Sequence, residues 1–164
     1  MARHLGSGGY ADVGAWHGGS TVTIAHGLKD GGHKGTVYSV DFFHTDTEGH
    51  SIPTAPDALR KYFDQHFENH GIHLNLCVGE SSTWGTMIDE PLKFVFIDAD
   101  HHYEFCKKDF QAWGRLVVPG GVVAFHDCQF RSVNAVVEEA GPEWIQGRKI
   151  FSTRLLVRSE AQKA

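Results

Sequence analysis

Short apolar segments typical of strands alternate with amphipathic segments typical of helices along almost the whole chain. The pattern predicts helices over 20–28, capped by Ser20, and over 57–70, 103–113 and 132–140, with strands over 10–16, 36–43, 73–80, 92–100 and 122–128. One or two terminal strands are expected within 148–159, a turn over 118–121 and a short connection over 82–90. Sustained βαβ alternation favours an α/β fold with a doubly wound, mostly parallel sheet, helices on both faces and a C-terminal antiparallel strand.

The composition fits one globular domain that recognises a small molecule. With 164 residues, 41% of them hydrophobic, the chain can bury one core, which we place in residues 10–158 between a flexible N-terminus (1–9) and a tail (159–164). The net charge is -5 and the basic residues are dispersed, which argues against nucleic-acid and membrane-surface binding. Three cysteines without CxxC spacing, no long apolar run and no signal peptide are typical of a cytoplasmic protein.

A glycine or an aspartate lies at or just after the end of each of five successive predicted strands. These residues are Gly14, Asp41, Gly79, Asp98 and Asp127. Ligands of doubly wound sheets bind outside the carboxyl ends of the strands. The sequence therefore predicts one binding rim made from five strand ends.

The segment "DVGAWHGGST" (12–21) has the composition of a ligand-binding turn between a strand and a helix. Gly14 permits a tight turn, Gly18 and Gly19 allow close backbone approach, and the helix N-terminus at Ser20 favours negative groups. The spacing differs from the GxGxxG dinucleotide fingerprint. Asp41, about 20 residues further on, is placed to accept both hydroxyls of a ribose, or is simply a solvated carboxylate at a strand end.

The segment "FIDADHHYE" (96–104) places ionisable side chains directly after a buried strand. If the fourth and fifth strands pair, Asp98 and Asp127 face each other, which is the geometry that a shared divalent cation such as Mg²⁺ needs. Asp100 and His101 are both candidates for the general base. The alternative is that Asp98 and Asp100 only cap the helix that begins near Tyr103.

These motifs resemble those of the class I S-adenosylmethionine-dependent methyltransferases. The resemblance rests on "DVGAWHGGST", "VYSVD", "VGESS" and "FVFIDADHHYEFCKKDFQAWGRLVVPGGVVAFHD", and it covers residues 10–158. It points to the branch that includes metal-dependent O-methyltransferases of natural-product sugars and phenols. It implies a Rossmann-like methyltransferase sheet, S-adenosylmethionine as cofactor, a divalent cation (Mg²⁺ or Mn²⁺) and a small hydroxyl acceptor.

The resemblance also assigns roles by motif. The glycine turn would hold the methionine portion of the cofactor, the acid of the second strand the ribose, and the acid and hydroxyl after the third strand the adenine. The implied cofactor residues are Asp12, Gly14, Gly18, Gly19, Ser20, Asp41, Glu80, Ser81 and Asp98. Asp100 is favoured as the base by resemblance, whereas the pKa of an ordinary histidine favours His101.

The implied metal ligands are Asp98, His126 and Asp127. The resembling enzymes have an Asp-Asp or Asp-Asn pair after the fifth strand, where this chain has His126-Asp127. An imidazole suits Mn²⁺, Fe²⁺ or Zn²⁺ better than Mg²⁺. Two other roles stay open for His126: it accepts a proton, or it only packs.

Three functions are weighed. The favoured one is O-methylation of a sugar or phenol, the second is a nicotinamide-dependent oxidoreductase, and the third is a non-catalytic binding or assembly module. The lack of GxGxxG and of a Tyr-Lys acid pair disfavours the second. The third is suggested by His126 and by a first strand only about ten residues from Met1, where the resembling enzymes carry N-terminal helices. In the resembling enzymes these helices partly cover the cofactor and the substrate, and we expect the loop 44–56 to provide part of this cover here. Because the sheet would otherwise leave apolar surface exposed, we also expect that the protein can form a homodimer.

Overall fold

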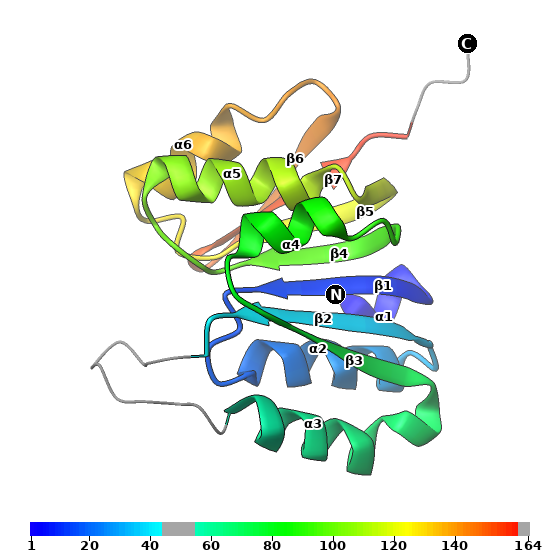
Figure 1. The fold of residues 1–164 in the computed structure, drawn as a ribbon. Coiled ribbons are helices and arrows are strands. Elements are labelled where there is room, and N and C mark those ends of the chain that lie inside the picture. The colour runs from blue at the N-terminus through cyan, green and yellow to red at the C-terminus, as the bar shows by residue number, and fades with distance from the viewer. Residues whose placement is uncertain (44–54, 161–164) are drawn as a thin grey trace.

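The computed structural model describes residues 1–43 and 55–160. Within these ranges the strands form one sheet (Figure 1). The strands are β1 (Gly8–Val13), β2 (Gly35–Asp41), β3 (Ile72–Val78), β4 (Leu92–Ile97), β5 (Val117–Phe125), β6 (Trp144–Ile150) and β7 (Thr153–Arg158). Their spatial order is β3-β2-β1-β4-β5-β7-β6.

The helices cover the sheet in two layers (Figure 1). One layer holds α1 (Ala2–Leu5), α2 (Gly19–Asp30) and α3 (Ala55–His66), which is followed by the 3₁₀ turn η1 (Glu68–His70). The other holds α4 (Ser81–Met87), α5 (Tyr103–Gly114) and α6 (Arg131–Glu138). Alternate residues of each buried strand pack against opposite layers. In β4, for example, Phe94 belongs to the core on the α2 side and Val95 to the core on the α5 side.

The strand order reverses beside β1. The chain builds β1, β2 and β3 outward in one direction and then returns to place β4 on the other side of β1. All of these pairs are parallel, as is the β4–β5 pair, whereas β7 runs antiparallel to β5. The predicted doubly wound sheet with a C-terminal antiparallel strand is confirmed. Its topological switch point lies between the carboxyl ends of β1 and β4, where such sheets bind ligands.

Four local expectations need correction. Helix α2 begins at Gly19 with the left-handed Gly18 as its N-cap, so Ser20 is not the cap. The expected connection over 82–90 contains all but the first residue of helix α4. The expected turn over 118–121 lies inside β5, where the pairing with β4 shifts register and Gly120 has a φ of 77°. The N-terminal segment forms α1, and its Ala2 is buried.

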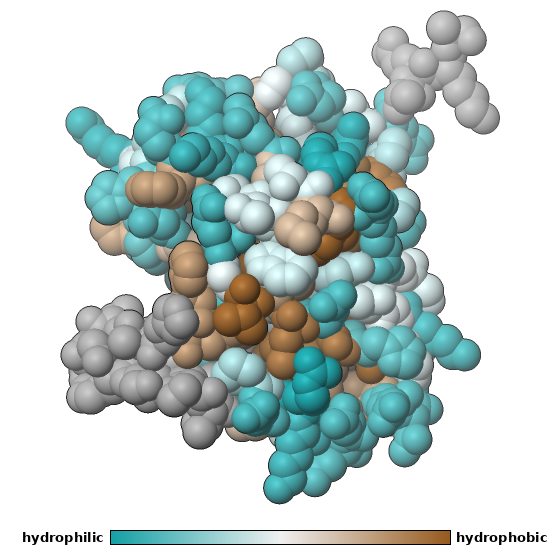
Figure 2. All heavy atoms as spheres, in the orientation of Figure 1, coloured by the Kyte–Doolittle hydropathy of each residue, from teal (hydrophilic) through white to brown (hydrophobic). Residues whose placement is uncertain are grey.

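Part of the molecular surface is apolar. Figure 2 shows apolar surface between α3 and α4, over the edge strand β3. Exposed apolar side chains in these elements include Val78 and Met87.

Two expectations from the sequence stay untested. The homodimer stays a prediction, and the loop 44–56, expected to cover part of the site, lies almost entirely outside the described residues. No helix in residues 1–43 or 55–160 has both the length and the apolar character needed to cross a bilayer.

Candidate functional site

A cavity of about 680 Å³ opens at the carboxyl ends of the strands, beside the switch point. Its wall combines the loops after β1, β2, β3 and β4 with the first turn of α4 and the first two turns of α5. It is lined by Gly14, Trp16, Val40, Asp41, Phe42, Gly79, Glu80, Ser81, Ser82, Asp98, Ala99, Asp100, His101, Phe105, Lys108 and Asp109. The predicted rim therefore exists, and four of its five strand ends reach the same cavity.

The turn after β1 requires glycine for two reasons. Gly14 has a φ of 88°, which L side chains rarely adopt. A Cβ built on Gly14 would lie 2.2 Å from the backbone oxygen of Asp98. The ends of β1 and β4 are therefore in contact through backbone atoms, and this contact places Asp98 at the cavity wall.

Asp41 is fixed by the backbone around it. Its Oδ2 accepts a hydrogen bond from the N–H of Trp16 at 2.8 Å, and its Oδ1 accepts one from the N–H of Phe43 at 2.9 Å. The side chain thus ties the end of β2 to the turn after β1. Each carboxylate oxygen has a second lone pair, so both can still accept a hydroxyl from a ligand in the cavity.

The start of α4 supplies the far wall of the cavity. The carboxylate of Glu80 accepts hydrogen bonds from the hydroxyls of Thr83 and Ser82, and these bonds lower its pKa. The hydroxyl of Ser81 donates to the buried carboxylate of Asp109 in α5. Burial raises the pKa of Asp109 to about 6, although the bond from Ser81 acts in the opposite direction.

Asp12 lies beneath the cavity and not in its wall. Its side chain is fully buried, and its Oδ2 accepts hydrogen bonds from the hydroxyls of Ser20 and Thr21 in the first turn of α2. Burial raises the pKa of Asp12 to about 6, and the buried Oδ1 has no hydrogen-bond partner. Direct cofactor contact by Asp12 or Ser20 stays a prediction, because in this structure the pair anchors α2.

Gly18 and Gly19 also lie outside the cavity wall. A Cβ on Gly18 would lie 2.8 Å from the side chain of Leu59, so this glycine allows α3 to pack closely on the turn. A Cβ on Gly19 would meet nothing within 4 Å. Their role in cofactor approach stays a prediction as well.

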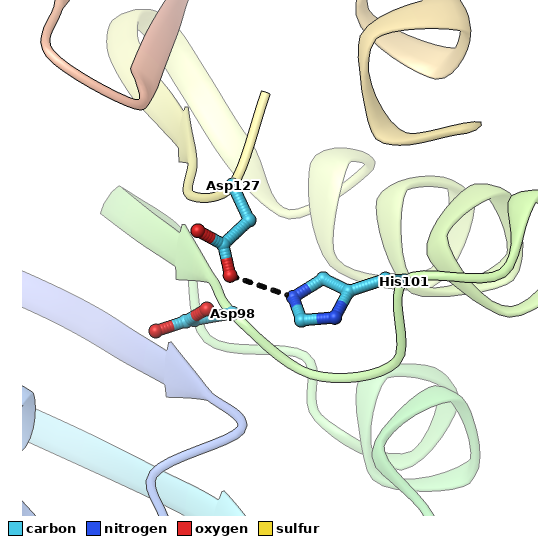
Figure 3. Close-up of side chains that lie close together, drawn as sticks. All are labelled: Asp98, His101 and Asp127. Atoms are coloured by element: carbon cyan, nitrogen blue, oxygen red, sulfur yellow. Dashed lines mark ion pairs between the residues drawn. The ribbon is translucent and has the colours of Figure 1, made fainter. Parts of the chain in front are cut away.

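Asp98, His101 and Asp127 form an acid–imidazole cluster after β4 and β5 (Figure 3). One potential ligand atom from each residue lies within 4.8 Å of the others. His101 Nε2 is 2.9 Å from Asp127 Oδ2. This nitrogen is buried and makes no hydrogen bond of good geometry. Within residues 1–43 and 55–160, these are the three acidic or histidine side chains whose potential ligand atoms lie close enough together to bind one metal ion.

His126 contacts both carboxylates of this cluster. Its Nδ1 is 3.0 Å from Asp98 Oδ1 and 3.3 Å from Asp127 Oδ1, and its Nε2 is 3.1 Å from the hydroxyl of Ser152. Both ring nitrogens of His126 are therefore engaged. Burial raises the pKa of Asp98, and the neighbouring His126 opposes that shift.

Asp127 adopts a strained backbone conformation. Its φ is 53°, which is uncommon for a residue other than glycine. Its Oδ1 also accepts a hydrogen bond from Gln129 at 2.8 Å. The conformation directs the carboxylate between His101 and His126. His101 therefore contacts Oδ2 of Asp127 and His126 contacts Oδ1, and the expected role of the His126-Asp127 pair as metal ligands stays a prediction.

Asp100 and His102 pair with each other at the cavity entrance. Asp100 Oδ1 accepts the backbone N–H of His102 at 2.7 Å and lies 2.6 Å from its ring Nδ1. Partial burial acts to raise the pKa of Asp100, but these contacts lower it overall. Helix α5 has His102 as its N-cap, so neither Asp98 nor Asp100 is its cap residue.

The donor set fits a divalent cation. Two carboxylates and one imidazole converge, and the buried Nε2 of His101 is left without a hydrogen bond, as a ligand nitrogen would be. The third group of this set is His101, and the predicted role of His126 as a ligand stays a prediction. Sequence spacing could not distinguish the two histidines, because the choice depends on how the loop after β4 turns.

Sequence reasoning missed several contributors. Phe105, Lys108 and Asp109 reach the cavity from one face of α5, which their spacing of three and four residues could have indicated. Ser152 comes from the β6–β7 hairpin and has no signal in the sequence. Tyr103 and Lys107 form a Tyr-Lys pair that the sequence analysis did not consider, with Lys107 Nζ 2.6 Å from the Tyr103 hydroxyl.

That pair does not support the oxidoreductase alternative. The hydroxyl of Tyr103 donates to Glu139 of the loop after α6, and Lys107 lies 3.3 Å from the same carboxylate. Neither Tyr103 nor Lys107 lines the cavity.

Comparisons with known proteins agree with this architecture. Residues 11–128 match the model of a family described as a methyltransferase domain. The fold is similar to that of the TDP-rhamnose 3'-O-methyltransferase CalS11 of calicheamicin biosynthesis (TM-score 0.70, 16% identity, 92% of this chain and 71% of that chain). It is also similar to the O-methyltransferase NovP (0.73, 14%, 93% and 72%) and to an O-methyltransferase from Bacillus cereus in complex with S-adenosylhomocysteine (0.63, 18%, 96% and 77%).

Proposed function

The chain belongs to the methyltransferase domain family, and from this premise we propose that it transfers the methyl group of S-adenosylmethionine to a hydroxyl of a small acceptor. One observation carries the proposal. A single cavity is lined both by Asp41, a strand-end acid suited to a ribose, and by Asp98 of the acid–imidazole cluster. The cofactor site and the acceptor site would therefore be adjacent, as a direct transfer requires.

The cofactor would occupy the β1–β2–β3 side of the cavity. Gly14 leaves room for close approach of the methionine portion, and Asp41 accepts the two ribose hydroxyls. Ser81 and Glu80 would border the adenine end, and the half-exposed ring of Phe105 lines the same cavity. The Bacillus cereus neighbour in complex with S-adenosylhomocysteine supports this choice of ligand.

The acceptor hydroxyl would lie at the cluster. Its oxygen attacks the methyl carbon, the new C–O bond forms as the C–S bond breaks, and the sulfur keeps the electron pair of that bond. Asp98, His101 and Asp127 would hold a divalent cation, which would lower the pKa of a coordinated hydroxyl. Asp100, which lines the same cavity, would accept the hydroxyl proton.

Isothermal titration with S-adenosylhomocysteine tests the proposal. We expect saturable binding to the wild-type protein, weakened about 100-fold by Asp41→Ala because two hydrogen bonds to a charged acceptor are lost. Asp57→Ala, which removes an exposed acid of α3, is the matched control and should bind normally. A parallel titration with NADH addresses the oxidoreductase. Binding of NADH without binding of S-adenosylhomocysteine would refute the proposed function.

A further inference from the structure

Helix α5 carries a buried acid that the proposed transfer does not use. Asp109 is only 3% exposed, yet it is one of the residues that line the cavity. Within residues 1–43 and 55–160, its carboxylate accepts one hydrogen bond, from the hydroxyl of Ser81 at the start of α4. A buried carboxylate needs donors in place of the water that it has lost. One donor leaves most of its acceptor capacity unused.

The charges around Asp109 do not compensate for its burial. Burial raises the pKa of Asp109 to about 6, and the acids Glu80 and Asp100 raise it further. Lys108 also lines the cavity, but its ammonium lies over the ring of Phe105, 5.5 Å from the centroid. At pH 8 Asp109 is ionised and acts only as an acceptor. The cavity therefore presents a desolvated acceptor to its occupant.

Asp109 and Phe105 lie on the same face of α5. They are four residues apart, about one helical turn, and both line the cavity together with Ser81. Helices α4 and α5 lie side by side (Figure 1), and Nε1 of Trp113 donates to the backbone oxygen of Ser81 at 3.0 Å. The half-exposed ring of Phe105 offers a flat apolar face. A planar occupant that carries a hydrogen-bond donor therefore satisfies both Phe105 and Asp109.

Two acids at this end of the cavity could accept such a donor, and their burial distinguishes them. Glu80 is exposed, and its carboxylate already accepts the hydroxyls of Ser82 and Thr83. A ligand without a donor would leave Glu80 to water at little cost. The same ligand would leave the buried carboxylate of Asp109 unpaired, which is costly. Asp109 is therefore the acid whose hydrogen bond discriminates between occupants.

We propose that Asp109 makes the cavity specific for adenine by accepting a hydrogen bond from the exocyclic amino group of this base. The inference rests on the proposed function, because it concerns the cofactor of the same transfer. Hypoxanthine has a carbonyl in place of the amino group and would direct an acceptor at Asp109. The site should then reject S-inosylhomocysteine, although its ribose and amino-acid portions are those of S-adenosylhomocysteine.

Isothermal titration at pH 8 with the two ligands measures the ratio of their affinities. We expect the wild-type protein to prefer S-adenosylhomocysteine about 100-fold, since the other complex leaves a buried acceptor unpaired. Asp109→Asn should reduce this preference about tenfold, because a carboxamide offers both a donor and an acceptor. Glu104→Gln neutralises an exposed acid of the same helix that is not among the cavity-lining residues, and it should keep the wild-type ratio.

A second variant separates recognition from packing. Ser81→Ala removes the hydroxyl that links α4 to Asp109 but retains the carboxylate. Its affinity ratio should stay close to that of the wild type. A ratio that falls in Ser81→Ala as far as in Asp109→Asn would assign the discrimination to the link between the helices and overturn the inference.

The remaining outcomes are distinguishable. A wild-type ratio near one, or an equal loss of both affinities in a folded Asp109→Asn, would overturn the inference and leave the methyltransferase proposal intact. The wild-type ratio needs no variant, so the inference can be overturned even if Asp109→Asn fails to fold. Failure of the wild-type protein to bind either ligand would refute the proposed function, and this inference with it.

Discussion

The two halves of the rim are built in different ways. The half formed by β1, β2 and β3 depends on backbone geometry: a left-handed Gly14 against the backbone of Asp98, and an Asp41 held by two backbone N–H groups. The half formed by β4, β5 and the β6–β7 hairpin depends on side chains, with His126 bridging Asp98 and Ser152. A backbone site tolerates few substitutions without loss of the fold, whereas a side-chain site can change its chemistry while the fold persists.

Gly14→Ala gives the largest effect expected from this contrast. The new Cβ would meet the Asp98 carbonyl in a backbone conformation that alanine disfavours, so the free energy of unfolding should fall by about 3–5 kcal/mol. Urea denaturation followed by circular dichroism measures it. Gly19→Ala is the matched control, because a Cβ there meets nothing within 4 Å. Equal stability of the two variants would contradict the backbone account.

The buried Asp12, which anchors α2 to β1, makes a pH-dependent contribution to stability. Burial raises the pKa of Asp12 in the folded state to about 6, above its ordinary value of 3.8, so between these pH values the folded protein binds more protons than the unfolded chain. The free energy of unfolding therefore falls as the pH rises from about 4 to 7, with a contribution from Asp12 of about 3 kcal/mol. Asp109 contributes in the same direction.

Asp12→Asn should reduce that slope, which denaturation curves at pH 4.5 and 7 would reveal. The exposed Asp57→Asn is the control. Identical pH slopes in the wild type and in Asp12→Asn would show that the buried Asp12 is not the titrating group.

Mn²⁺ binding, followed by electron paramagnetic resonance, tests the side-chain half. Asp98→Asn and His101→Ala should each weaken Mn²⁺ about 10–100-fold because each removes a ligand. Circular dichroism should show both variants folded. Undiminished Mn²⁺ affinity in His101→Ala would exclude this residue as a ligand and return the third position to His126.

Ser152→Ala gives the smallest expected effect. Its hydroxyl contacts the outer nitrogen of His126 and no residue of the acid–imidazole cluster, so Mn²⁺ affinity should fall about threefold and affinity for S-adenosylhomocysteine should not change. A loss as large as that in Asp98→Asn would mean that the hairpin, and not the strand ends, determines the geometry of the cluster.

The difference between the two halves of the rim also explains which parts of the fold and of the site could be predicted from the sequence. Alternating periodicity is a local property, and the positions of Gly14, Asp41 and Asp98 at the cavity follow from the rule that parallel strands end at one rim. The partners of His126 could not be predicted, because Ser152 is 26 residues away in a hairpin whose packing has no local signal. The burial of Asp12 was missed because a carboxylate at the end of a strand is equally compatible with a ligand contact and with an anchor for α2.

The most direct test of adjacent cofactor and cation sites is paramagnetic broadening of bound S-adenosylhomocysteine by Mn²⁺, measured by NMR. We predict the strongest broadening for the methylene protons that flank the sulfur and the weakest for the adenine protons. Asp98→Asn should abolish the broadening while S-adenosylhomocysteine remains bound. Broadening that is absent, uniform along the ligand or strongest at the adenine would contradict the account.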